Sequence, residues 1–202
     1  KVPIWCVTPH DGRAFHRFFD TSPVSPGGRY VAFLRIPQET HLPQPGEQAE
    51  VCVTNLETGE ERRVATTQGW ESQMGANINW GPDDTQLVFN DVDTETWEAF
   101  AVRCDVATGR KHRLQGPVYQ VSPDGRWACG ANPVPMRRTQ DGYGVVVPDE
   151  RVPRHVGPRD DDGLWLTDTQ TGEAKLVLSL HDAIERAQPP FEIDEPDRYE
   201  IY

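Results

Sequence analysis

The sequence predicts an all-β fold, a β-propeller built of four-stranded antiparallel blades, and three observations support this prediction. One hairpin turn occurs three times, at residues 55–60, 105–110 and 168–173. A second turn, with proline at its second position, recurs out of phase with the first, at residues 25–30, 81–85 and 122–127. Short alternating or apolar runs flank both turns, and a unit that returns every forty to sixty residues, about the length of a propeller blade, indicates this architecture.

The chemistry of the two turns indicates which strands they join. In the first turn, glycine follows threonine at positions 59, 109 and 172, and glycine readily supplies the positive φ that a short hairpin with a bulge requires. In the second turn, proline presets φ and is followed by Asp or Gly, which is typical of a tight turn. We expect the proline turn to join the first strand of each blade to the second, and the threonine–glycine turn to join the third to the fourth.

The blades are predicted in chain order within one partial propeller domain, residues 1–202. We expect blade one at about 15–68, blade two at about 69–116, blade three with a long insertion at about 117–180, and a linker with the start of a fourth blade at 181–202. Residues 181–187 are predicted to form a short helix, and Ile4–Val7 resembles a strand of a neighbouring blade. Because a propeller closes only when its last blade meets its first, the remaining blades of the same polypeptide are expected partners.

Composition argues against two classes of partner. The formal net charge is −12, and affinity for nucleic acid comes largely from Lys and Arg, so nucleic acid is not expected. No apolar stretch approaches the roughly twenty residues that a membrane-spanning helix needs, so a membrane is not expected either. Cys6, Cys52, Cys104 and Cys129 form no C-x-x-C pair, and we interpret them as free thiols packed within strands, with a disulfide between neighbouring strands as the alternative.

Two insertions interrupt the repeat, and connections of this kind carry binding sites more often than regular strands do. The smaller spans residues 38–48 and the larger spans residues 132–162, each between the second and third strands of its blade. The larger insertion gathers Arg137, Arg138, Arg151, Arg154 and Arg159 around Tyr143 and His155 in an otherwise acidic chain. This local positive charge predicts an anionic ligand. Alternatively, the arginines pair with nearby acidic residues and fix the loop in place.

Five elements, taken in order, resemble the propeller-type polysaccharide lyases, which include the ulvan lyases and, more distantly, the oligogalacturonate lyases. These elements are Trp70–Trp80, Phe89–Asp91, Pro117–Gly125, Asp141–Gly144 and Asp161–Gly163. The resemblance covers most of the chain, from Phe15 to Leu180, and its Gly-Tyr-Gly and Asn-Asp elements are moderately specific. It implies a seven-bladed propeller that cleaves a uronate-containing polysaccharide or oligosaccharide by β-elimination, in the periplasm or outside the cell.

The resemblance also implies roles for individual residues. β-Elimination needs a group that neutralises the uronate carboxylate, a base for the adjacent proton and an acid for the leaving oxygen. Tyr143 matches the family's tyrosine acid or base, and Arg159 falls where the family's arginine neutralises the carboxylate. The family's two histidines are not matched, because Asn79 holds the first position and the second falls near Trp97. Asn79 is then expected to bind the substrate carboxylate as a hydrogen-bond donor.

Further residues of the chain are candidates for the same site. His16 could replace a missing histidine, because an unperturbed imidazole suits proton transfer near neutral pH; alternatively it is a structural residue bonded to a backbone carbonyl. Arg138 and His155, in the basic insertion, are predicted to contact the substrate. Trp70 and Trp97, at loop ends, are predicted platforms for a sugar ring, whereas Trp80, Trp127 and Trp165 are predicted to fill the space between blades.

No particular cofactor is indicated, and no histidine spacing is typical of a metal site. The run Asp160–Asp162 could contribute to a calcium site, although such a run is more often a solvated turn. Two other function classes stay open. One is a non-catalytic propeller that binds a protein or a glycan. The other is a glycoside hydrolase with paired carboxylates, for which Asp20 and Asp91 are the candidates.

Overall fold

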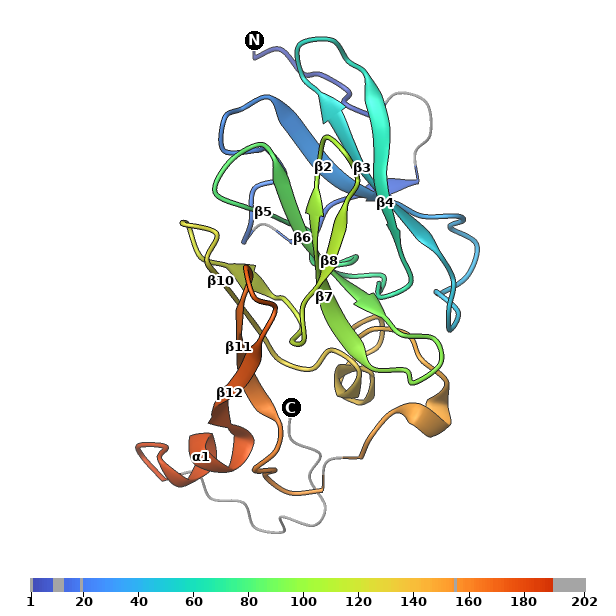
Figure 1. The fold of residues 1–202 in the computed structure, drawn as a ribbon. Helices are drawn as coiled ribbons and strands as arrows, with labels where there is room; N and C mark the ends of the chain where they lie inside the picture. The colour runs from blue at the N-terminus through green and yellow to red at the C-terminus, as the bar shows by residue number, and fades with distance from the viewer. Residues whose placement is uncertain (1, 9–12, 19, 155, 191–202) are drawn as a thin grey trace.

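The structure of the protein, a computed structural model, describes residues 2–8, 13–18, 20–154 and 156–190. Its strands form three four-stranded antiparallel sheets, which confirms the predicted all-β propeller fold (Figure 1). Sheet one contains β1 (Ala14–Phe15), β2 (Tyr30–Arg35), β3 (Ala49–Asn55) and β4 (Glu61–Thr67). Sheet two contains β5 (Asn79–Trp80), β6 (Gln86–Val92), β7 (Ala99–Asp105) and β8 (Lys111–Arg113). Sheet three contains β9 (Gln120–Val121), β10 (Trp127–Gly130), β11 (Gly163–Asp168) and β12 (Ala174–Ser179).

The threonine–glycine turn joins the third strand to the fourth in every sheet, as predicted. Its glycines, at positions 59, 109 and 172, have φ values of 72°, 71° and 83°. The Asn or Asp that opens each turn accepts a hydrogen bond from the threonine N–H through its side-chain oxygen. The threonine hydroxyl accepts another from the N–H two residues further on. The repeated sequence is therefore one repeated hydrogen-bond pattern, which explains why these residue types recur together.

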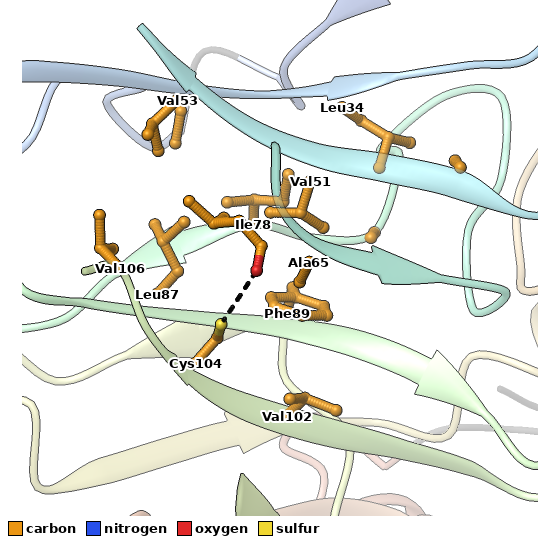
Figure 2. Close-up of a cluster of buried hydrophobic side chains, with 14 of the residues drawn as sticks. Leu34, Val51, Val53, Ala65, Ile78, Leu87, Phe89, Val102, Cys104 and Val106 are labelled. Atoms are coloured by element: carbon orange, nitrogen blue, oxygen red, sulfur yellow. Dashed lines mark hydrogen bonds between the residues drawn. The ribbon is translucent and has the colours of Figure 1, made fainter. Parts of the chain in front are cut away.

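The hydrophobic core lies between neighbouring sheets. Between sheets one and two, Leu34, Val51 and Val53 face Leu87 and Phe89, and Figure 2 shows these side chains pointing toward one another. A smaller cluster between sheets two and three contains Val88, Ala101, Leu114, Val118, Val121 and Ala128. Successive residues of a strand point to opposite faces, so β6 contributes side chains to both interfaces.

The connections between strands lie at two ends of the sheets. At one end the two kinds of turn meet, and the Leu56 N–H donates a hydrogen bond to the Arg29 carbonyl across them. The same bond recurs between Val106 and Thr85 and between Thr169 and Arg126. At the other end lie the second-to-third strand connections and the segments that cross between sheets. We call this end the connection face; it contains residues 36–48, 68–78, 93–98, 114–119, 131–154 and 156–162.

A short helix, α1 (Leu180–Glu185), follows β12 and confirms the helix predicted after blade three. Ser179 caps it by accepting a hydrogen bond from the Asp182 N–H at 2.9 Å. The predicted start of a fourth blade falls largely on residues 191–202, outside the described residues. Within the described part of the chain, no helix is long and apolar enough to cross a membrane.

Several expectations for the apolar residues were wrong. Ile4–Val7 forms no strand, and Ile4 and Trp5 are 96 % and 82 % exposed, because no sheet in the described part of the chain pairs with this segment. Trp70 is buried in the core between sheets one and two, where its indole N–H donates to the Glu47 carbonyl at 2.7 Å. Trp127, expected in the core, is 39 % exposed.

The cysteines are free thiols, as predicted, but they are not all packed within strands. Cys52 and Cys104 are buried, Cys129 is half-buried in β10, and Cys6 is exposed outside any strand.

Candidate functional site

The long insertion is held in place by a small core of its own. Its described residues include two short 3-10 helices, η1 (Pro135–Arg138) and η2 (Asp149–Arg151). Val134, Val145, Val147 and Val152 form a buried cluster with Val92 of β6, and Trp97 and Ala99 pack against it. The insertion is therefore anchored on the end of sheet two.

An open cleft of about 580 Å³ lies on the connection face. It is bounded by the β6–β7 turn, the β8–β9 crossing segment, the insertion and the start of β11. Its aromatic and charged lining residues are Trp97, Glu98, Arg151, Arg159, Asp161, Asp162 and Trp165. Indole rings can stack on a sugar ring and guanidinium groups can bind a carboxylate, so this lining suits a charged carbohydrate.

Trp97 occupies the glycine position of a fourth copy of the repeated turn. Asp93 Oδ1 accepts from the Thr96 N–H at 3.2 Å, as the opening residue does in the other three turns. The Trp97 φ is 64°, in the left-handed region that glycine favours. This conformation costs a non-glycine residue about 1 kcal/mol or more. The sequence pattern did not reveal this copy, because a tryptophan stands in place of the glycine.

Arg159 lines the cleft, and Arg138 does not. Arg159 binds the Asp161 carboxylate through Nε and Nη2, and this hydrogen bonding and charge raise the pKa of Arg159. Arg138 donates to the Val152 carbonyl at 2.9 Å and the Pro153 carbonyl at 3.2 Å. Arg138 thus fixes the insertion in place, as the structural alternative for these arginines expected, but it does so by binding backbone carbonyls.

Tyr143 is not among the residues that line the cleft. Its ring meets the Phe18 ring edge-on, with centroids 6.0 Å apart. The preceding Gly142 carbonyl accepts a hydrogen bond from the Ser72 hydroxyl at 3.1 Å. The Gly-Tyr-Gly element therefore connects the insertion to the segment after β1 and to the crossing segment between sheets one and two.

The innermost strand of sheet one is interrupted by an excursion. Phe15 pairs with Leu34, and Val24 pairs with Val31. The two pairing residues are nine positions apart on the inner strand but only three apart on β2. Residues 16–18 and 20–23 therefore leave the sheet, and we call them the inner excursion. The excursion carries His16, Arg17 and Asp20 toward the first strands of the other sheets.

Arg17 and Asp20 join the inner excursion to Tyr119, which lies just before β9. The Arg17 side chain has no exposed surface; it binds Asp20 at 2.8 Å and the Tyr119 carbonyl. The Tyr119 hydroxyl donates to Asp20 Oδ2 at 2.8 Å. Burial raises the pKa of Asp20, but the hydrogen bond from Tyr119 and the charge of Arg17 outweigh it and leave the pKa below its ordinary value.

Asn79 lies beside this group but uses its amide for structure. It is 4 % exposed, and its Nδ2 donates to the Asn77 carbonyl at 2.8 Å and the Tyr119 carbonyl at 3.2 Å. Asn90, in the family's Asn-Asp element, similarly exchanges two hydrogen bonds with the Val118 backbone. Both asparagines fasten sheet two to the segment that leads into sheet three.

Two groups near Arg17 have strongly shifted pKa values. Burial and the charge of Arg17 lower the pKa of His16 to about 4, against the opposing charge of Asp20 and a backbone hydrogen bond with Ala32. His16 is therefore neutral, and a weak base, at neutral pH. Burial raises the pKa of Glu71 to about 7, although its carboxylate accepts hydrogen bonds from the Gln73 and Met74 N–H groups. Glu71 is 2 % exposed, so it holds a turn and is not open to a ligand.

The structure thus divides the sequence-derived site residues between two places. Trp97 and Arg159 line the cleft. His16 and Asn79 lie near Arg17 and Tyr119 instead, and Tyr143 contacts Phe18 of the same inner excursion. His155 lies outside the described residues. Sequence reasoning did not single out Arg17, Glu71 or Tyr119, and among the described residues no group of three or more His, Cys, Asp or Glu is placed to hold a metal ion.

Comparisons with known proteins show similarity in fold to several solved structures. No protein-family model matches the chain, and no curated protein matches its sequence. The solved structures with a similar fold include TolB from Acinetobacter baumannii, a putative TolB from Agrobacterium tumefaciens and the AtxE2 isopeptidase. Their sequence identities are 11 %, 19 % and 14 %, with TM-scores of 0.48, 0.45 and 0.47.

The chain spans less than half of each of these proteins. The matches cover 82 %, 79 % and 84 % of this chain but 32 %, 47 % and 31 % of the three structures. No polysaccharide lyase is among them. On the evidence of its three sheets, the chain is a β-propeller protein.

Proposed function

We propose that this β-propeller binds a uronate-containing polysaccharide on its connection face and cleaves it by β-elimination, in the periplasm or outside the cell. The observation that carries the proposal is the cleft, in which Trp97 and Trp165 lie with Arg151 and Arg159. A uronate residue offers an apolar ring face to an indole and a carboxylate to a guanidinium group. The cleft therefore has the chemistry to hold one or more uronate residues.

The Arg159–Asp161 pair supports this assignment. Asp161 presents a carboxylate to both Nε and Nη2 of Arg159, which is the bidentate arrangement that a substrate carboxylate would adopt. Both side chains are partly exposed, at 42 % and 60 %, and an exposed ion pair contributes only about 0–1 kcal/mol. A uronate carboxylate can therefore displace Asp161 at little cost, and the neutralised uronate would then lose its adjacent proton more readily.

Tyr143 is the proposed acid or base for the elimination. Tyr143 lies outside the cleft, and the proton that it would transfer is on the carbon next to the carboxylate that Arg159 would bind. Elimination therefore requires Tyr143 and Arg159 to reach the same uronate residue. A phenol can accept the proton beside the carboxylate or return one to the leaving oxygen, provided the reacting atoms come within hydrogen-bond distance.

To test catalysis, the protein is incubated with ulvan, pectin fragments and other uronate polymers, and the absorbance of newly formed unsaturated uronate is measured. Product is expected from at least one polymer, and Tyr143→Phe should abolish it without weakening binding. Full activity of the Tyr143→Phe variant, or no product from any polymer, contradicts the catalytic part of the proposal.

Binding is measured separately by calorimetry with oligouronates. Trp97→Ala and Arg159→Gln should each weaken binding at least about tenfold, the loss expected when one well-placed contact of about 1.4 kcal/mol is removed. Arg63→Gln, on the outer strand β4, is the control and should bind normally. The same oligomers with their carboxylates reduced to alcohols should not bind. Binding without product in the first assay would identify the alternative, a non-catalytic glycan-binding propeller.

A further inference from the structure

The cleft contains two guanidinium groups that differ in their surroundings. Arg159 binds the Asp161 carboxylate, and that pair occupies its Nε and Nη2. Arg151, at the end of η2, also lines the cleft and is exposed. In the described part of the chain, no residue forms an ion pair or a side-chain hydrogen bond with Arg151. One of the two cations is therefore paired within the protein, and the other is available to a ligand.

The backbone that carries Arg151 is fixed on both sides. The Arg151 N–H donates to the Pro148 carbonyl at 2.8 Å, and the Val152 N–H donates to the Asp149 carbonyl at 3.2 Å. The Val152 side chain is 8 % exposed and packs in the valine cluster on the end of sheet two. Arg151 thus combines a fixed backbone with an open guanidinium group. Less conformational freedom is then lost when a ligand binds, which favours binding.

Arg138 adds to this support. Its guanidinium donates to the carbonyls of Val152 at 2.9 Å and Pro153 at 3.2 Å, the two residues that directly follow Arg151. Arg138 itself is not among the residues that line the cleft. Any effect of Arg138 on a ligand in the cleft would therefore act through the position of Arg151.

We infer that Arg151 binds a second anionic group of the substrate, so that the cleft selects polymers in which another carboxylate lies close to the uronate on Arg159. A carboxylate that replaces Asp161 engages Nε and Nη2 of Arg159 with both of its oxygens, which leaves Arg151 for a different group. Arg151 is then a specificity-determining residue, and Arg138 is its positioning residue. This inference rests on the proposed function, because it takes the uronate on Arg159 as given.

The test compares two uronate trisaccharides by calorimetry. The first carries all three carboxylates, and in the second two of them are reduced to alcohols. The wild-type protein should bind the tricarboxylate at least about thirtyfold more tightly, a tenfold gain from the second guanidinium on top of a statistical factor of about three. Arg151→Gln should reduce this preference to the statistical factor alone.

Arg154→Gln is the matched control. It removes the same charge from an exposed position of the same insertion, but Arg154 does not line the cleft, so the preference should be unchanged. The inference is overturned if the wild-type preference is only statistical, if Arg151→Gln keeps the full preference, or if Arg154→Gln loses as much.

The same measurements distinguish the two proposals. If Arg159→Gln weakens binding while Arg151→Gln leaves the preference unchanged, the second anion site is wrong and the proposed function stands. If the wild-type protein binds neither trisaccharide, both are wrong.

A double-mutant cycle tests the positioning role of Arg138. Arg138→Gln should weaken tricarboxylate binding at least about fivefold in the wild-type background and have no further effect in the Arg151→Gln background. Equal losses in both backgrounds would show that Arg138 only holds the insertion together. If Arg138→Gln does not fold, Arg138→Lys, which keeps a donor for one of the two carbonyls, provides the same comparison.

Discussion

Arg17 and Tyr119 are separated by 102 residues in the sequence, yet the Arg17 guanidinium lies 4.4 Å from the centroid of the Tyr119 ring and donates a hydrogen bond to the Tyr119 carbonyl. This contact joins the inner excursion of sheet one to the residue just before β9, the strand that begins sheet three. Asn79 donates to the same carbonyl from sheet two. One carbonyl group therefore receives hydrogen bonds from elements of two other sheets.

Arg17→Ala should destabilise the fold strongly. The substitution removes a fully buried guanidinium, so Asp20 loses its cationic partner and the Tyr119 carbonyl keeps only the hydrogen bond from Asn79. Breaking a buried charged interaction of this kind costs about 3 kcal/mol, measured as the free energy of unfolding in urea. Arg63→Ala, which breaks an exposed pair with Glu50, is the control and should change that free energy by at most about 0.5 kcal/mol. Equal effects of the two substitutions would contradict the assigned role of Arg17.

Glu71→Gln should change how stability depends on pH. The pKa of Glu71 is about 7 in the folded protein, above its ordinary value of 4.5. The folded state then holds the proton more tightly than the unfolded state, so this stabilising contribution is present at low pH and is lost as the pH rises from about 4.5 to about 7. Relative to Glu71→Gln, the wild-type protein should lose up to about 3 kcal/mol across this window. Urea unfolding on both sides of the window measures the difference, and a constant difference would show that Glu71 titrates normally.

His16→Asn should reveal a pH dependence of the opposite sign. The pKa of His16 falls from 6.5 to about 4 on folding, so the unfolded state binds the proton more tightly. The wild-type protein should therefore lose stability relative to the variant as the pH falls from about 6.5 to about 4. The same unfolding series measures it. If the wild type gains stability relative to the variant on acidification, the buried, neutral imidazole is ruled out.

The strain at Trp97 can be measured by comparing two substitutions at that position. Trp97→Ala and Trp97→Gly both remove the ring from the valine cluster and the cleft, but only glycine adopts a φ of 64° without strain. The glycine variant should therefore be the more stable of the two, by about 1 kcal/mol. Thermal and urea unfolding of the pair provide the measurement. Equal stability would mean that the backbone relaxes when the ring is removed.

Turns whose hydrogen bonds join residues close in the sequence could be predicted from the sequence. Contacts that depend on how the strands pair could not. The threonine–glycine turns follow from Asn55, Thr58 and Gly59 and their equivalents, which bond to one another within six residues. The contact of Arg17 with Tyr119 depends on the inner excursion, in which nine positions of the inner strand correspond to three of β2. No local sequence pattern predicts this difference in length. The residue composition of the site was foreseen better than its geometry.

The errors over tryptophan have a similar cause. A ring at the end of a loop gives the same sequence signal whether it is exposed or buried. Trp70 is buried because the Glu47 carbonyl, on a different connection, accepts its indole N–H. Trp97 was placed correctly at a loop end, but its unusual backbone was hidden because the turn was recognised by its glycine.

The left-handed tryptophan has a genetic consequence. Tryptophan is encoded only by TGG, and a single base change to GGG gives the glycine that the other three copies of this turn contain. A single base change is thus enough to remove the backbone strain at position 97. Where selection no longer requires the indole ring, glycine is the replacement that we expect natural variants to carry at position 97, and sequencing of related strains would show it.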